Sequence, residues 1–142
     1  MENKMNQLLS DLVVEYHKLQ NFHWYVKGPD FFQVHLKLEE MYNAINVAID
    51  EVAEAMLMQG DKPYGNLKEF LSQTKIEEAQ IGNVKSSVVW SEVLKDFKYL
   101  QDLCKDIKEE AGENKSSNIE QLMDGYISAF DKDIWMLNQV TA

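Results

Sequence analysis

Apolar side chains recur three or four positions apart along most of the chain, which is the spacing of one face of an α-helix. In the first segment this pattern continues up to Gly28-Pro29, where glycine and proline disfavour helix, and it predicts a helix of about 23 residues. A second, unusually long helix is predicted from this break to about Gln59, before Gly60. The apolar positions of the first helix are Met5, Leu8, Leu9, Leu12, Tyr16, Leu19 and Val26.

Two more helices are predicted in the second half of the chain, one ending near Gly112 and one following it. Before them, a turn at residues 63–65 precedes a short helix, and residues 73–87 read as a connection. The pattern predicts an all-α four-helix bundle with a short extra helix in the crossover between the second and third helices, in one domain of residues 1–142. The apolar positions of the last two helices are Trp90, Val93, Leu94, Phe97, Cys104 and Ile107, then Ile119, Leu122, Met123, Tyr126, Ile127, Phe130, Ile134 and Leu137.

Three helix starts match the capping-box pattern. In this pattern a short polar side chain and an acidic or amide side chain three residues later each bond the other's backbone N–H group. It predicts side-chain caps at the start of the second helix, of the short helix and of the fourth helix. The pairs are Asp30 with Gln33, Asn66 with Glu69, and Ser117 with Glu120.

The composition predicts a soluble protein. Of the 142 residues 45% are hydrophobic, yet no stretch approaches the roughly 18 uninterrupted apolar residues of a membrane span. The first residues, Met-Glu-Asn-Lys-Met-Asn, lack the apolar core of a secretion signal. The single cysteine, Cys104, excludes an internal disulfide and is expected to be a small buried apolar residue. We therefore expect a cytoplasmic protein without membrane association.

The charge of the chain favours metal ions over nucleic acid as partners. Acidic residues number 24 against 14 basic ones, the net charge is −10, and every basic residue is a lysine. Bidentate contacts from arginine to phosphate groups are therefore excluded. Neither end of the chain carries a basic tail that could release counterions from DNA. A strongly acidic body instead raises the local concentration of cations.

Four potential metal ligands lie on one stripe of the second helix. His35 and Glu39 are four residues apart, as are Asp50 and Glu54, so that each pair occupies adjacent turns. At about 100° per residue, the three acids lie about 40°, 60° and 100° from His35 around the helix axis. Glu39 and Asp50 are nevertheless roughly 16 Å apart along that axis, too far for one metal ion. A second copy packed antiparallel about a twofold axis would bring the first pair opposite the second.

A fifth potential ligand comes from the first helix. If the first two helices fold back as a hairpin around Gly28-Pro29, residues equidistant from the turn become neighbours, and His23 and His35 are nearly equidistant from it. Carboxylates combined with one or two imidazoles and no thiolate suit iron or manganese better than a structural zinc site. The alternative interpretation of the acidic pairs is an ordinary solvated helix face.

The run from His23 to Phe32, His-Trp-Tyr-Val-Lys-Gly-Pro-Asp-Phe-Phe, resembles a signature of the Dps family of mini-ferritins. That signature is a His-Trp pair, a glycine, paired phenylalanines, a second histidine twelve residues after the first, and an acidic series on the same helix. Residues 67–71 resemble the short crossover helix of the family, and residues 131–136 a motif of its last helix. The resemblance covers essentially the whole chain and implies a ferritin-like bundle. The matching positions after the run are His35, Glu39, Tyr42, Asp50, Glu51 and Glu54.

The resemblance also implies a ferroxidase centre, a site that oxidises Fe(II), shared between two subunits. His23, His35 and Glu39 would come from one subunit, and Asp50 and Glu54 from its twofold mate. The family forms a hollow homo-oligomer, a dodecamer, that oxidises Fe(II) with hydrogen peroxide in most members, or with dioxygen, and stores the ferric mineral. Such a cage protects the cell against oxidative damage. Carboxylate oxygens suit this chemistry because hard ligands stabilise Fe(III) relative to Fe(II).

Further roles are implied by the same resemblance. Trp24 would lie beside the centre and intercept one-electron oxidation products, and its alternative role is hydrophobic packing. His17 matches no ligand, and Asp133 stands where many relatives have histidine, a change expected to touch an interface rather than the centre. Acidic residues near the start of the last helix would line an ion channel at a threefold axis; the candidates are Glu120, Asp124 and Asp131.

Three other functions are left open by the sequence. A nucleoid DNA-binding protein of the same fold would need a Lys- or Arg-rich tail, so tight DNA binding is not expected. A helical interaction protein could keep the cage without the chemistry, but it would not need the five ligands. A di-iron oxygenase with its site inside one bundle would need Glu-x-x-His motifs, and none occurs. The ferroxidase and iron-storage cage is the function that the sequence favours.

Overall fold

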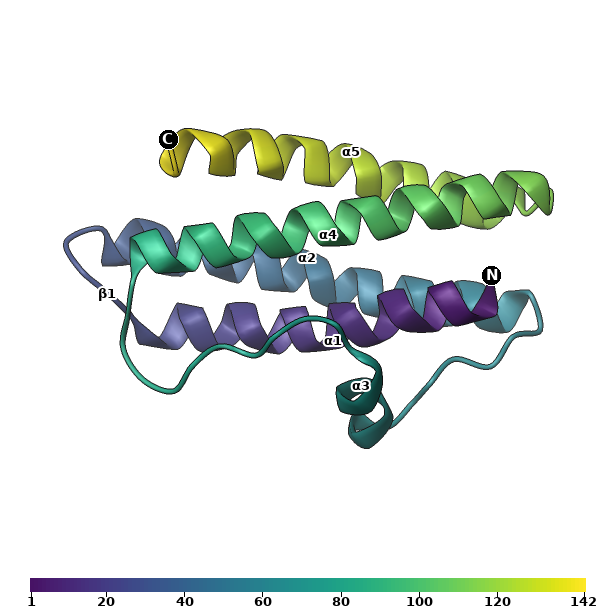
Figure 1. Cartoon of the computed structure of the whole chain (residues 1–142), viewed down its shortest axis with the longest axis horizontal. Helices are drawn as coiled ribbons and strands as arrows, with labels where there is room; N and C mark the ends of the chain where they lie inside the picture. The colour runs from purple at the N-terminus through teal and green to yellow at the C-terminus, as the bar shows by residue number, and fades with distance from the viewer.

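Four long helices lie side by side in the computed structural model, which describes all residues from 1 to 142 (Figure 1). The first two form one antiparallel hairpin, the last two form another, and the connection between the hairpins runs back along the first helix. This connection carries the short helix α3 (Leu67–Gln73). The predicted all-α bundle with an extra helix in a long crossover is confirmed. The long helices are α1 (Glu2–Tyr25), α2 (Phe31–Met58), α4 (Ser86–Glu113) and α5 (Ser117–Val140).

The end of α2 is set by a glycine in a left-handed conformation. Gly60 has a φ of +87°, which residues with a side chain adopt only with strain. The Gly60 amide donates to the carbonyl of Leu57, and the Asp61 amide to that of Met56, both at 3.0 Å. These two bonds form a Schellman motif, which satisfies the last carbonyls of the helix. The helix therefore stops where the sequence predicts.

The turn between α4 and α5 is also closed by a Schellman pair of hydrogen bonds, although the left-handed residue there is not a glycine. Lys115 adopts a φ of 58°. The Ser116 amide then donates to the carbonyl of Ala111 at 2.8 Å. Ser116 is the residue that precedes α5, and no side chain caps this helix. The predicted capping box of Ser117 with Glu120 is wrong, because Ser117 already lies in the first turn of the helix.

The other two predicted caps have opposite outcomes. Asn66 Oδ1 accepts a hydrogen bond from the Glu69 amide at 3.0 Å, so this cap is confirmed. Asp30 precedes α2, but its side chain caps no amide. Asp30 Oδ2 instead accepts a hydrogen bond from Ser86 Oγ at 2.8 Å, which ties the α1–α2 turn to the start of α4. The capping box of Asp30 with Gln33 is therefore wrong, because a tertiary partner takes the carboxylate.

Two short parallel strands, β1 (Val26–Lys27) and β2 (Val84–Lys85), pair next to this contact. Two residues give no periodic pattern, so the sequence carries no signal for them. Helix α4 begins directly after β2, at Ser86, within the stretch of residues 73–87 that the sequence predicts to be a connection. The strand pairing holds the chain in place directly after α1, and His23 lies in the last turn of that helix.

A cluster of 27 buried apolar residues contains members of all four long helices and Phe70 of α3. Because both hairpins contribute, neither has a complete core alone. Cys104 is fully buried in this cluster, as predicted, and burial raises the pKa of its thiol to about 12. The thiol is therefore protonated and weakly nucleophilic at neutral pH. No helix is both long enough and apolar enough to cross a membrane.

Asp11, which is fully buried in α1, attaches the crossover to the bundle. Its carboxylate accepts hydrogen bonds from the Thr74 hydroxyl at 2.8 Å and the Lys75 amide at 2.7 Å, just after the end of α3. The Tyr99 hydroxyl of α4 donates to the same carboxylate. Burial together with this bond raises the pKa of Tyr99. One carboxylate thus joins α1, the crossover and α4.

Candidate metal centre

The α1–α2 hairpin brings His23 and His35 face to face. Gly28 makes the turn with a φ of +141°, and the Phe31 amide donates to its carbonyl at 3.1 Å. The two imidazole rings stack with centroids 3.6 Å apart and planes inclined by 10°. The histidines are therefore neighbours, as the distance of each from the turn predicts.

Each imidazole is held by the backbone beside the other one. His23 Nδ1 lies 2.7 Å from the carbonyl oxygen of His35, and His35 Nδ1 lies 2.8 Å from that of His23. A carbonyl oxygen only accepts hydrogen bonds, so both Nδ1 atoms must carry the proton. In the neutral rings each Nε2 then keeps a free lone pair, which is the form of histidine that binds a metal. The backbone therefore fixes both the tautomer and the orientation of the rings.

Glu39 adds a carboxylate to the two imidazoles. Its Oε1 lies 3.8 Å from His23 Nε2, and its side chain is half exposed. Aromatic rings restrain the histidines: Phe31 stacks on His35 with centroids 4.8 Å apart, and Tyr42 meets His23 edge-on at 5.2 Å. We call His23, His35 and Glu39 the imidazole arm. It offers two ring nitrogens in fixed positions and one carboxylate that can adjust.

Asp50 and Glu54, which we call the carboxylate pair, lie farther along α2, and both are exposed. Within one chain, no three His, Cys, Asp or Glu side chains are grouped so that they could hold a metal ion together. The chain brings His23 close to both His35 and Glu39, but these three side chains do not form a complete site, and the carboxylate pair is not brought to them. The five predicted ligands therefore form two separate parts.

Exposed apolar side chains share a face of α2 with these ligands. Phe32, Leu36 and Val47 are 76%, 61% and 58% exposed. At about 100° per residue, all three lie roughly 60–120° from His35 around the axis, the sector that also holds the carboxylate pair. Large apolar groups on one exposed stripe are typical of a surface that a partner covers.

Comparisons with known proteins agree with this arrangement. A family profile described as a ferritin-like domain matches residues 2–142. The DNA protection during starvation protein 2 of Bacillus anthracis is 37% identical over 133 residues, which are 94% of this chain and 90% of that protein. The crystal structure of Dps from Staphylococcus aureus, 35% identical, superposes with a TM-score of 0.95 over 99% of this chain and 94% of that one. The chain belongs to the Dps family of mini-ferritins.

A further relative connects the Dps fold to iron. The Dps protein of Vibrio cholerae, described as a member of a broad superfamily of ferritin-like diiron-carboxylate proteins, is 30% identical. Its structure matches with a TM-score of 0.95 over 99% of this chain and 88% of that one. Membership in the family supports iron binding and a role in iron storage and protection.

The remaining residues singled out from the Dps resemblance make other contacts in the single chain. Trp24 is 56% exposed, and its ring meets that of His17 edge-on at 6.2 Å. Asp124 pairs with Lys108 at 2.6 Å. Asp131 accepts a hydrogen bond from Gln101 at 2.7 Å, and Glu120 lies in the first turn of α5. One chain does not group the three acids, so a shared channel would require several copies.

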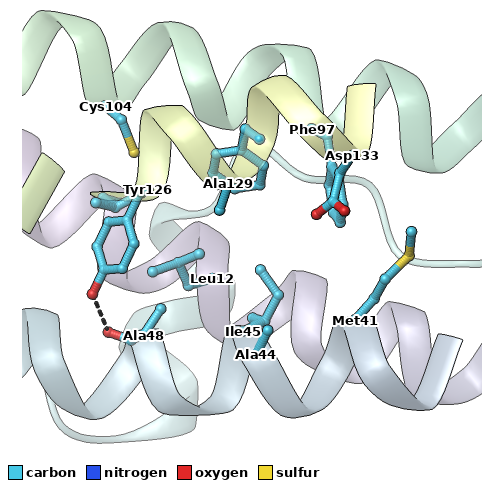
Figure 2. A pocket seen from close by; sticks show the side chains of 12 residues that line it. Leu12, Met41, Ala44, Ile45, Ala48, Phe97, Cys104, Tyr126, Ala129 and Asp133 are labelled. Carbon is cyan, nitrogen blue, oxygen red and sulfur yellow. Dashed lines mark hydrogen bonds between the residues drawn. The ribbon is translucent and has the colours of Figure 1, made fainter. Parts of the chain in front are cut away.

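The bundle also contains a cavity of about 90 Å³ that is lined by residues of all four long helices (Figure 2). Its lining is apolar apart from Asp133, and it includes none of the five predicted ligands. Tyr126 stands toward one end, where Figure 2 marks the hydrogen bond from its hydroxyl to the carbonyl oxygen of Ala48. The same hydroxyl donates to Glu51 at 2.9 Å. Burial raises the pKa of Asp133 against the opposite effect of Lys37 and Lys132. The cavity is therefore separate from the metal centre.

Some contacts of the imidazole arm were not foreseen from the sequence. Phe31 precedes His35 by four positions and Tyr42 follows it by seven, so both lie on the same face of α2. This helical spacing in the sequence is sufficient to predict which aromatic rings lie beside the histidines. The sequence does not predict a second group, of buried charges between α1 and α4.

Proposed function

We propose that the protein is a ferroxidase that oxidises Fe(II) at sites shared between two copies of the chain and stores the ferric mineral inside a homo-oligomeric cage. The observation that carries this proposal is the contact of both Nδ1 atoms with backbone carbonyl oxygens, which leaves the two Nε2 atoms free to bind a metal and places that of His23 beside Glu39. Two oriented imidazoles and a carboxylate suit Fe(II) as a substrate. They do not complete a coordination shell, so positions stay open for further ligands and an oxidant.

The carboxylate pair of a second copy supplies the missing ligands in this proposal. The separation of the two parts along α2 fits antiparallel packing of two α2 helices about a twofold axis, with the exposed apolar side chains between them. Each such pair of chains then contains two equivalent sites. Repetition of these pairs gives the dodecamer that the Dps resemblance implies.

The proposed reaction balances in electrons and in oxygen atoms when hydrogen peroxide is the oxidant. Two Fe(II) ions each lose one electron, and one hydrogen peroxide takes both as its O–O bond breaks. Its oxygens and those of water then become the oxide and hydroxide of the mineral, with release of protons to solvent. The carboxylates offset the charge that iron gains on oxidation. With dioxygen as the alternative oxidant, the same two electrons would reduce it to peroxide.

The test of this function uses the assembled protein under nitrogen. Substoichiometric Fe(II) is added first, and hydrogen peroxide or air-saturated buffer afterwards, while Fe(III) is followed by absorbance. We expect rapid oxidation by particles of about 200 kDa, the mass of a dodecamer of this chain. Oxidation no faster than in a protein-free solution, with either oxidant, would overturn the proposal.

Two further assignments belong to the same proposal. Trp24 follows a ligand in the sequence and is well exposed on the single chain, so an assembled particle could bring its indole near the site. There it would supply electrons to one-electron oxidants. Glu120, Asp124 and Asp131 would line a route for iron entry where several copies meet. We further propose that the whole chain acts as one ferritin-like domain in the cytoplasm.

Relatives are named for DNA protection during starvation, so a second candidate function to be tested is binding to DNA. We propose that this chain does not bind DNA tightly, because it has no arginine and a net charge of −10. In a gel shift at low salt, where such contacts are strongest, we expect no retarded duplex DNA at micromolar protein. A retarded band that disappears as salt is added would show the opposite.

A further inference from the structure

The core contains charged residues that the metal centre does not use. Glu15 and Lys18 of α1 face Glu92 and Asp96 of α4, and Glu15 is fully buried. Lys18 and Asp96 are only 3% and 4% exposed. Lys18 Nζ lies 2.8 Å from Asp96 Oδ2 and 3.7 Å from Glu92 Oε2. The lysine therefore has two acidic partners, of which Asp96 is the closer.

Glu15 has no corresponding partner. Both of its carboxylate oxygens are buried, and neither accepts a hydrogen bond from any group of the chain. A buried carboxylate without donors loses its hydration and gains nothing in return. The acids that face it, Asp96 and Glu92, add repulsion, and Lys18 is the one cation near it. An ionised Glu15 is the least favourable charge state for this part of the core.

The charge balance of these residues points to one extra proton. With all groups ionised, three carboxylates against one ammonium leave two negative charges uncompensated in the core. A proton on Glu15 removes one of these two negative charges. It also turns the Glu15 carboxyl group from an acceptor without a partner into a hydrogen-bond donor toward Asp96. Asp96 then accepts from Glu15 and pairs with Lys18, while Glu92 is partly exposed to solvent.

The expected ionisation of each group agrees with this geometry. Burial raises the pKa of Glu15 well above its ordinary value, and the neighbouring Asp96 raises it further, whereas Lys18 lowers it. Burial lowers the pKa of Lys18, but its hydrogen bond and ion pair with Asp96 outweigh this effect and the net shift is upward. Lys18 therefore remains an ammonium ion.

We propose that Glu15 and Asp96 share one proton in the core at neutral pH and that this proton makes the stability of the α1–α4 contact fall as pH rises. Loss of the proton places two carboxylates against each other where the two hairpins meet. At any pH between the pKa of Glu15 in the unfolded chain and its pKa in the folded chain, the folded chain binds one proton more than the unfolded chain. Over that interval the folding equilibrium constant falls by about tenfold for each unit of rising pH. Below that interval the proton on Glu15 contributes its full stabilisation to the folded chain.

The first test is infrared spectroscopy of the assembled protein in the carboxyl region. At neutral pH we expect a C=O band of a protonated carboxylic acid that disappears in Glu15→Gln and in wild-type protein at high pH. Asp133 is a second partly buried acid, so the comparison with Glu15→Gln is needed to assign the band. The control is Glu109→Gln, an exposed position of α4 that should leave the spectrum unchanged. A wild-type spectrum without any band that is lost in Glu15→Gln overturns the proposal.

The second test compares urea midpoints of the two proteins over a range of pH. Glutamine keeps the shape and a donor toward Asp96 without a titrating proton, so Glu15→Gln should fold and should lack the decline in stability with rising pH that wild type shows. Contacts between subunits titrate equally in both proteins and cancel in the difference. If Glu15→Gln does not fold, Glu15→Met serves as the non-titrating variant. Parallel pH profiles of variant and wild type would contradict a shared proton.

Discussion

Replacement of Asp50 by asparagine and Glu54 by glutamine is expected to abolish iron oxidation while the helical bundle stays folded. Both side chains are exposed on the single chain, so their loss leaves no buried group unpaired. Mutation of groups that only orient a metal ligand already costs roughly 10–100-fold in affinity or activity. We therefore expect the initial rate with substoichiometric Fe(II) to fall by about a hundredfold or more. Stopped-flow absorbance measures the rate, and circular dichroism the helix content.

The matched control for this variant changes two exposed acids of α4 in the same way, Asp102→Asn and Glu109→Gln. It removes the same charge without touching α2, so it separates ligation from the general attraction of cations to an acidic surface. The control should oxidise iron at close to the wild-type rate. Equal activity of the two double variants would remove Asp50 and Glu54 from the site.

Asp11→Ala is expected to cause the largest loss of stability among single changes outside the apolar core. The alanine leaves the Thr74 hydroxyl, the Lys75 amide and the Tyr99 hydroxyl without their acceptor. Each unpaired donor costs about 1–3 kcal/mol when buried, and partial access to water reduces the sum. We expect a loss of about 3 kcal/mol in the free energy of unfolding, measured by urea denaturation.

Two observations would distinguish a detached crossover from a general weakening of the bundle in Asp11→Ala. Limited proteolysis of Asp11→Ala should cut first in residues 61–85, because the crossover loses its attachment to α1. Asp106→Ala, an exposed acid of α4, should change stability by no more than about 0.5 kcal/mol. If Asp11→Ala is as stable as this control, the carboxylate does not anchor the crossover.

The helices and the pairing of the histidines could be predicted because both depend on local spacing. The apolar period identifies every long helix, and Gly60 marks the end of α2 through a backbone conformation that favours glycine. His23 and His35 become neighbours from their distances to a single turn. The helices of the fold and the pairing of the two histidines therefore follow from local features of the sequence.

Two failures of prediction, at Asp30 and at Glu15, share one physical cause, which is interaction with partners distant in the sequence. Asp30 matches a cap by sequence, but the Ser86 hydroxyl takes its carboxylate. Glu15 occupies a core position in the series Leu8, Leu12, Glu15, Leu19 and Phe22, and this break in the apolar pattern was the available signal for a buried acid. Its neighbours Asp96 and Lys18 become apparent only when α1 and α4 pack. A complete metal site is likewise absent from the single chain, since its two parts lie at separate places along α2.

Mixed particles offer the most direct test of a site made from the imidazole arm of one chain and the carboxylate pair of another. His35→Ala and Asp50→Asn chains carrying different affinity tags are coexpressed, and particles containing both are isolated and assayed for Fe(II) oxidation. Each variant alone has a defect in every site, whereas a mixed pair has one doubly defective and one intact site. Random pairing should therefore restore about a quarter of wild-type activity. Mixed particles no more active than the separate variants would contradict a site shared between two chains.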